Sequence, residues 1–151
     1  MTLITFGLLV VVAALSGSLF KPGEWYDRLR KPDWNPPKWV FPVVWSVLYI
    51  FIAVAGWLIW EEVGFSAALI VWGIQLVLNA AWSWLFFGLR RMDWAFWDVN
   101  GLIAFVSLFI IVAWPISTVA ALLFLPYLAW VCTAALLNWT IWRLNPDAAK
   151  T

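Results

Sequence analysis

Residues 39–60 read WVFPVVWSVLYIFIAVAGWLIW and contain no charged side chain. A helix that rises ~1.5 Å per residue needs ~20 residues to cross ~30 Å of hydrocarbon, so this run predicts a membrane-spanning helix. Four further apolar runs cover residues 2–20, 66–89, 94–114 and 119–142. We therefore expect one all-α membrane domain over residues 1–151, a bundle of five transmembrane helices joined mostly by short turns.

The composition agrees with a membrane protein. Hydrophobic residues make up 66% of the chain and charged residues only 11%, which is far from the mixture typical of a water-soluble domain. The apolar runs are longer than the strands of an outer-membrane barrel and lack their alternation of apolar and polar residues. They also fill most of the chain, so we expect no separate soluble domain and no nucleic-acid partner.

The basic residues predict how the chain is oriented in the bilayer. With five spans, all nine lie on one side, namely Lys21, Arg28, Arg30, Lys31, Lys38, Arg90, Arg91, Arg143 and Lys150. Loops rich in Lys and Arg are generally cytoplasmic. We expect a cytoplasmic membrane protein with its N-terminus outside and with the C-terminus and the 20–38 loop in the cytoplasm.

The 20–38 loop is the one long connection, and it reads KPGEWYDRLRKPDWNPPK over residues 21–38. Pro32, Pro36 and Pro37 fix φ and remove amide donors, so only the segment 24–30 is expected to form one or two helical turns. A stiff loop loses little conformational entropy when it closes over a ligand. We predict that this loop is a preorganised cap at the start of the second helix.

Polar and aromatic residues share single faces of three predicted helices. The sets are Gln75, Asn79, Trp82, Ser83 and Phe86; Trp45, Tyr49, Ile52, Ala53 and Gly56; and Tyr127, Val131, Ala134, Asn138 and Trp142. Polar side chains are costly in hydrocarbon unless they face a partner or a cavity. Two interpretations stay open: hydrogen bonds that only join the helices, or a cavity for a flat hydrophobic molecule with a few polar edges.

Several kinds of site are excluded by what the sequence lacks. The absence of histidine excludes bis-histidine haem ligation, zinc sites with histidine ligands and histidine acid–base catalysis. The single cysteine, Cys132, cannot form an internal disulfide. Since Glu61, Glu62, Asp93 and Asp98 fall near predicted helix ends, none is placed as the deep acid of a proton-coupled antiporter. We expect no metal site and no required cofactor.

Four stretches resemble the TspO/translocator protein family, also called tryptophan-rich sensory proteins or peripheral-type benzodiazepine receptors. They are EWYDRLRKPDWNPPKWVFPVVWSVLY at 24–49, GIQLVLNAAWSWLFFG at 73–88, RRMDWA at 90–95 and LPYLAWVCTAALLNWTIWRLN at 125–145. The resemblance covers nearly the whole chain. It implies five helices, the same orientation as the charges predict, and commonly a homodimer.

The resemblance also implies binding of tetrapyrroles, notably protoporphyrin IX, and of hydrophobic drug-like ligands. By motif position the ligand site would include Trp25, Tyr26, Trp34, Pro36, Trp45, Tyr49, Asn79, Trp82, Ser83, Trp94, Gly101, Ala134, Asn138 and Trp139. Arg28, Arg30, Lys31 and Lys38 surround the predicted mouth, where they would meet porphyrin propionates or else lipid headgroups. The resemblance thus favours a porphyrin-binding membrane receptor or sensor.

Two alternative functions follow from the same resemblance. Some bacterial members degrade protoporphyrin in light through tryptophans that match Trp45 and Trp139, so a light-dependent enzyme is one alternative. A tetrapyrrole transporter is the other. Sterol binding is not expected, because Trp139 stands where the animal sterol motif has a tyrosine.

Overall fold

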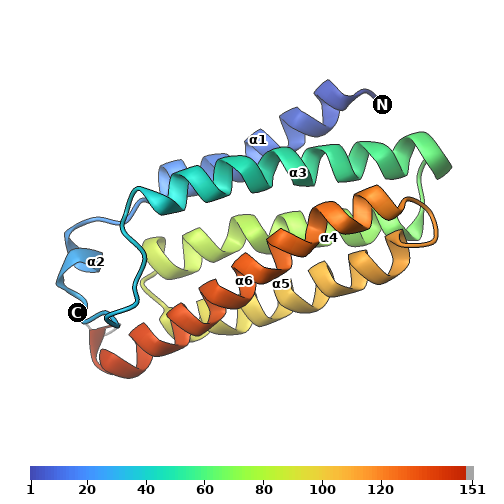
Figure 1. The fold of residues 1–151 in the computed structure, drawn as a ribbon. Helices are drawn as coiled ribbons and strands as arrows, with labels where there is room; N and C mark the ends of the chain where they lie inside the picture. The colour runs from blue at the N-terminus through green and yellow to red at the C-terminus, as the bar shows by residue number, and fades with distance from the viewer. Residues whose placement is uncertain (149–151) are drawn as a thin grey trace.

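The computed structural model describes residues 1–148, so Lys150 of the basic set lies outside the described residues. The helices are α1 (Leu3–Leu19), α2 (Glu24–Arg28), α3 (Val40–Val63), α4 (Ala67–Ser83), η1 (Trp84–Gly88), α5 (Met92–Ala113) and α6 (Thr118–Leu144). In Figure 1 the long helices α1, α3, α4, α5 and α6 lie side by side, with the short α2 beside the C-terminal end of α6. The predicted all-α membrane bundle is confirmed.

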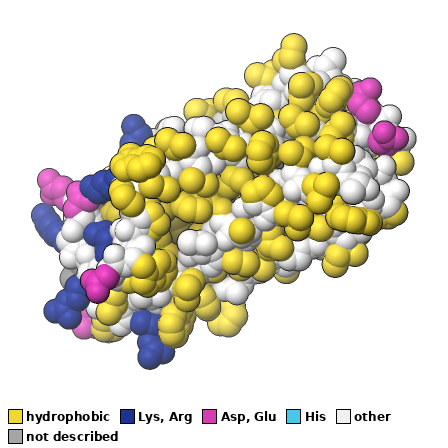
Figure 2. Space-filling model, viewed as in Figure 1, with side chains coloured by type: hydrophobic (Ala, Val, Ile, Leu, Met, Phe, Trp, Pro, Cys, Tyr) yellow, Lys and Arg dark blue, Asp and Glu magenta, His cyan; other side chains and the backbone are white. Residues whose placement is uncertain are grey.

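Within residues 1–148, four helices are long and apolar enough to cross a membrane: α3, α4 continued by η1, α5 and α6. The first helix, α1, is also apolar but has only 17 residues, which corresponds to about 26 Å. Figure 2 shows a mostly hydrophobic flank, with the Lys and Arg side chains in view gathered at the end that carries α2. The chain therefore has the surface of an integral membrane protein.

Local sequence signals set several helix ends. The hydroxyls of Thr2, Ser66 and Ser117 accept backbone N–H bonds from the first turns of α1, α4 and α6. Such N-caps satisfy donors that have no partner within the helix. At the other end of α3, Gly64 has φ +67°, a conformation that glycine adopts without a side-chain clash.

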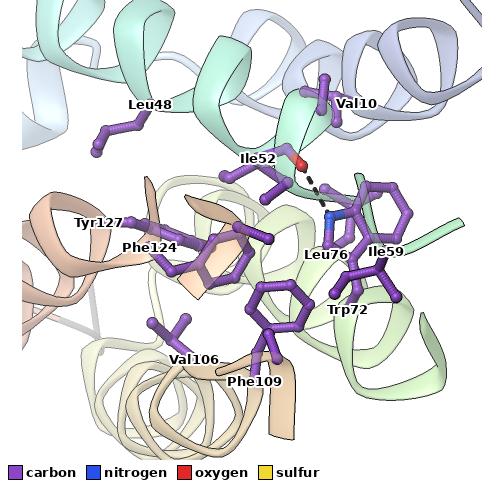
Figure 3. Close-up of a cluster of buried hydrophobic side chains, with 14 of the residues drawn as sticks. Val10, Leu48, Ile52, Ile59, Trp72, Leu76, Val106, Phe109, Phe124 and Tyr127 are labelled. Carbon is purple, nitrogen blue, oxygen red and sulfur yellow. Dashed lines mark hydrogen bonds between the residues drawn. The ribbon is translucent and has the colours of Figure 1, made fainter. Parts of the chain in front are cut away.

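The half of the bundle away from α2 is solidly packed (Figure 3). The Trp72 indole donates a hydrogen bond of 2.8 Å to the Ile52 carbonyl and meets the Phe6 ring edge-on at 5.3 Å. The Phe109 and Phe124 rings pack with centroids 4.1 Å apart. This core holds α1, α3, α4, α5 and α6 together, so any hollow must lie nearer to the α2 end.

The 20–38 loop is tied to the far end of the chain. Asn145, just after α6, donates to the Arg30 carbonyl at 2.8 Å and accepts from the Arg30 N–H at 2.8 Å. The Trp25 indole donates to the Ala148 carbonyl at 3.3 Å. Within the loop, α2 covers five of the residues in the segment 24–30 that was predicted to be helical. It lies between the proline-containing parts of the loop, as expected.

Candidate functional site

A cavity of about 600 Å³ lies in the half of the bundle nearest the loop. Its walls come from the end of α1, the loop, α3, α4, η1, α5 and α6. Most of the lining is apolar or aromatic, with a few amides and hydroxyls, which is typical of pockets for hydrophobic ligands. The interior of this half is therefore hollow, as the cavity interpretation required.

Eight of the predicted site residues line this cavity. They are Tyr26, Trp45, Tyr49, Asn79, Trp82, Ser83, Ala134 and Asn138. Trp45 and Tyr49 stack with ring centroids 5.4 Å apart, one turn from each other on α3. All of them except Tyr26 belong to the inward helix faces that the spacing predicted, so these faces do border the cavity.

Towards the solid core, a chain of hydrogen bonds borders the cavity. The Tyr49 hydroxyl donates to Asn79 Oδ1 at 3.2 Å, and Asn79 Nδ2 donates to the Tyr127 hydroxyl at 2.7 Å. The Tyr127 hydroxyl then donates to Gln75 Oε1 at 2.8 Å. Gln75 and Tyr127 are fully buried and do not line the cavity, whereas Asn79 and Tyr49 do. Both interpretations of these amides therefore apply. Gln75 only joins helices, whereas Asn79 joins helices and also lines the cavity.

A second amide fixes the wall between α4 and α6. Asn138 Oδ1 accepts from the Trp82 indole at 3.0 Å, and Asn138 Nδ2 donates to the Met92 carbonyl at 2.9 Å. Only 1% of Asn138 is exposed, so both bonds are shielded from water. One side chain therefore orients Trp82 and joins α4, α5 and α6.

The mouth of the cavity carries two cations, Lys21 and Lys38. Lys38 donates a hydrogen bond to the Asp27 carboxylate, which lowers the pKa of Asp27 and keeps it ionised. Burial raises the pKa of the Tyr26 phenol, so Tyr26 faces the cavity as a neutral group. The other predicted basic residues of the loop, Arg28, Arg30 and Lys31, do not line the cavity.

Six predicted site residues do not line the cavity: Trp25, Trp34, Pro36, Trp94, Gly101 and Trp139. Trp34, Trp94 and Trp139 are 47%, 50% and 41% exposed. The guanidinium groups of Arg91 and Arg143 lie over the Trp94 and Trp139 rings, at 4.0 and 5.2 Å.

Two of the others are held close to the site without lining it. Trp25 packs edge-on against Phe86, a residue of the wall, with centroids 5.9 Å apart. A Cβ on Gly101 would lie 3.8 Å from Leu78, so this glycine faces α4. Trp25 therefore supports the cavity wall from behind, and Gly101 lies at the contact between α5 and α4.

Trp130 lines the cavity and was missed as a site residue. Its ring meets Trp45 edge-on at 6.4 Å and Phe41 at 5.7 Å. Its spacing from Tyr127 and Ala134 places it on the same face of α6, which is a signal that the sequence offered. Phe20, Lys21 and Phe87 were missed as well. Within residues 1–148, no three His, Cys, Asp or Glu side chains gather to hold a metal ion.

Comparisons with known proteins agree along the length of the chain. The model of the TspO/MBR family matches residues 5–143. Protein CrtK of Rhodobacter capsulatus is 37% identical over 144 residues, covering 89% of this chain and 86% of that protein. A tryptophan-rich sensory protein of Cereibacter sphaeroides is 41% identical over 132 residues, covering 87% and 84%. The human translocator protein is 40% identical over 152 residues, covering 93% and 88%.

Proposed function

Because the chain belongs to the TspO/MBR family of membrane proteins, we propose that it is a receptor or sensor that binds protoporphyrin IX or a related tetrapyrrole. The observation that carries this proposal is the cavity of about 600 Å³ with aromatic walls. A flat macrocycle would lie between the Trp45–Tyr49 pair and Trp82. No cofactor is required for binding, and other hydrophobic drug-like molecules would compete for the same space.

The polar groups of the cavity suit the polar parts of such a ligand. Lys21 and Lys38 at the mouth would pair with propionate groups. Asn79 and Tyr49 at the inner end would face the macrocycle with an amide and a phenol. An amphipathic acid with a large apolar body therefore matches the cavity better than a neutral hydrocarbon does.

We also propose that the protein lies in a bacterial cytoplasmic membrane with the cavity mouth towards the cytoplasm. The basic residues at that end of the bundle support this orientation. A homodimer would use the apolar outer face of α1, where Ile4, Leu8 and Val12 are exposed. Cysteine labelling from either side of sealed vesicles tests the orientation, and cross-linking in membranes tests the dimer; labelling of Lys38→Cys only from the outside contradicts the first.

Titration with protoporphyrin IX tests the site. We expect saturable quenching of tryptophan fluorescence in the wild type, and about tenfold weaker binding in Trp45→Ala, because a stacked aromatic wall is lost. Trp97→Ala removes an exposed tryptophan on α5 and is the matched control. Equal affinity in Trp45→Ala and Trp97→Ala would contradict this site.

The variant Trp139→Ala distinguishes the site defined by the cavity lining from the site implied by the family resemblance, which includes Trp139. Since Trp139 lies on the outer face of α6, we expect its replacement to leave the affinity within about twofold of the wild type, a difference well below 1.4 kcal/mol. The same position argues against a light-driven reaction in which Trp45 and Trp139 contact one porphyrin together. Weaker binding in Trp139→Ala would revive that alternative.

Transport is the remaining alternative, and a flux assay distinguishes it. In liposomes that hold the purified protein, a receptor saturates with porphyrin and transfers none across the bilayer. A transporter shows transfer that depends on the protein. Trp45→Ala serves as the binding-deficient control in both outcomes.

A further inference from the structure

The third long helix ends in a π-helical turn, η1, where the backbone bonds span more residues than in an α-helix. The Leu89 N–H donates to the Trp84 carbonyl at 2.8 Å, five residues back, and the Arg91 N–H donates to the Leu85 carbonyl at 2.9 Å. Single π turns are rare in proteins overall, but those that occur are often found at functional sites. This one borders the cavity, since Phe86 and Phe87 both line it.

The wide turn lets two consecutive rings face the same neighbour. Successive side chains of an α-helix point ~100° apart, and a π turn reduces this angle because it holds more residues per turn. The Phe86 and Phe87 rings have centroids 4.8 Å apart. Both meet Tyr26 of α2 edge-on, at 6.4 Å and 5.6 Å, and Phe86 also meets Trp25. The 20–38 loop therefore packs on the pair.

The same two rings form part of the cavity wall. Trp82 stacks on Phe86 at 5.1 Å and meets Phe87 edge-on at 5.7 Å. Next to them, a Cβ on Gly88 would lie only 2.9 Å from the Phe20 ring, so this glycine allows the end of α1 to close on η1. The π turn η1 is therefore the place where the loop, the end of α1 and the α4 wall of the cavity meet.

We propose that the π turn of η1 is the positioning element that seats the 20–38 loop on the cavity rim. By presenting Phe86 and Phe87 together, it fixes Tyr26 and Trp25 where the loop completes the ligand site. An α-helical turn would direct one of the two rings away from Tyr26. The seating itself is independent of what the cavity binds, and only its effect on affinity rests on the proposed function.

Deleting Trp84 tests this inference, because one residue fewer allows the turn to close as an α-helix. Trp84 is 45% exposed, and Trp84→Ala is the matched control that removes the side chain and keeps the register. The readout is trypsin cleavage of the ligand-free protein after Arg28 and Arg30, which are exposed in the loop. We expect cleavage about tenfold faster in the deletion variant than in Trp84→Ala, as for the loss of roughly two aromatic contacts.

Mass spectrometry of the fragments assigns each cut to its position in the chain. If the deletion variant and Trp84→Ala are cut equally slowly after Arg28 and Arg30, the proposal is overturned. Circular dichroism of the same samples separates loop release from general loosening, because the helical signal of the deletion variant is expected to stay at the level of Trp84→Ala. A loss of helical signal that accompanies the faster cleavage overturns the proposal too, because the effect is then not specific to the loop.

Phe87→Leu keeps the inference testable if the deletion variant does not fold. This change preserves the chain length and an apolar side chain but removes the ring that meets Tyr26. We expect cleavage of the loop about threefold faster than in the wild type, consistent with one aromatic contact; a wild-type rate contradicts the proposal. Protoporphyrin titration of the same variants tests the proposed function separately. If the wild type does not bind protoporphyrin IX, the proposed ligand is refuted. The cleavage rates still decide whether η1 seats the 20–38 loop.

Discussion

Replacing Gly56 with alanine is expected to lower the free energy of unfolding by about 1–3 kcal/mol, as for other small-to-large changes in packed cores. A Cβ at this position of α3 would lie 2.5 Å from Trp72 Cε2 and 2.9 Å from Phe6 Cδ1. The indole cannot simply move aside, because its N–H is bonded to the Ile52 carbonyl on the same helix as Gly56. α1, α3 and α4 would therefore have to separate. Unfolding of the purified protein in mixed micelles, followed by circular dichroism, measures the loss.

Gly73→Ala is the matched control for this prediction. Gly73 lies on α4, and a Cβ there would meet nothing within 4 Å. Since alanine favours helix over glycine, this variant should be as stable as the wild type or slightly more so. Equal stability of Gly56→Ala and Gly73→Ala would contradict the close packing of Trp72 on α3.

Asn138→Ala is expected to cost about 1–3 kcal/mol of stability, because it removes two shielded hydrogen bonds between helices. The change leaves the Trp82 indole N–H without its acceptor and the Met92 carbonyl without the amide donor. Since Trp82 is part of the cavity wall, we also expect weaker binding of protoporphyrin IX. The unfolding measurement and the fluorescence titration read these two effects separately.

The control for this variant is Asn100→Ala on α5. Asn100 is exposed, and its amide donates at 2.7 Å to the Phe96 carbonyl of the same helix. Losing an exposed bond within one helix should change stability by no more than about 0.5 kcal/mol. If Asn138→Ala behaves like Asn100→Ala, the amide does not hold the wall in place.

These predictions concern two halves of one bundle with different packing. The half that contains Gly56 and Trp72 is solid, and its aromatic rings interlock. The half that contains Trp45 and Trp82 is hollow, and its polar side chains are bonded to one another around the space. Such a division lets the solid half hold the helices in place while the hollow half keeps room for a ligand.

The helices were predictable from the sequence because their causes are local. An apolar run long enough to cross a bilayer becomes a helix whatever its neighbours do, since unpaired backbone groups are too costly in hydrocarbon. The proline residues of the 20–38 loop likewise limited helix there to a short segment, seen as α2. The inward faces of α3, α4 and α6 followed from helical spacing, and Tyr49, Asn79 and Asn138 on these faces line the cavity.

The cavity lining differs from the motif positions where neighbouring residues of one helix point in different directions. Trp139 follows Asn138 directly, so it points ~100° away around α6, to the outside. Trp130 shares the inward face with Tyr127 and Ala134 and lines the cavity instead. Helical geometry alone would have separated these two tryptophans.

By itself, the sequence determined the all-α membrane bundle and the stiff loop, because each depends on residues near one another in the chain, and it placed the basic residues at the loops of one end. Only the tertiary structure decided that one half of the bundle is filled and the other hollow, and that Phe86 and Phe87 meet Tyr26 across the rim. These features depend on contacts between segments far apart in the sequence and on a π turn whose wider spacing departs from the α-helical repeat. Side-chain volumes summed along single helices do not reveal where packed helices leave space.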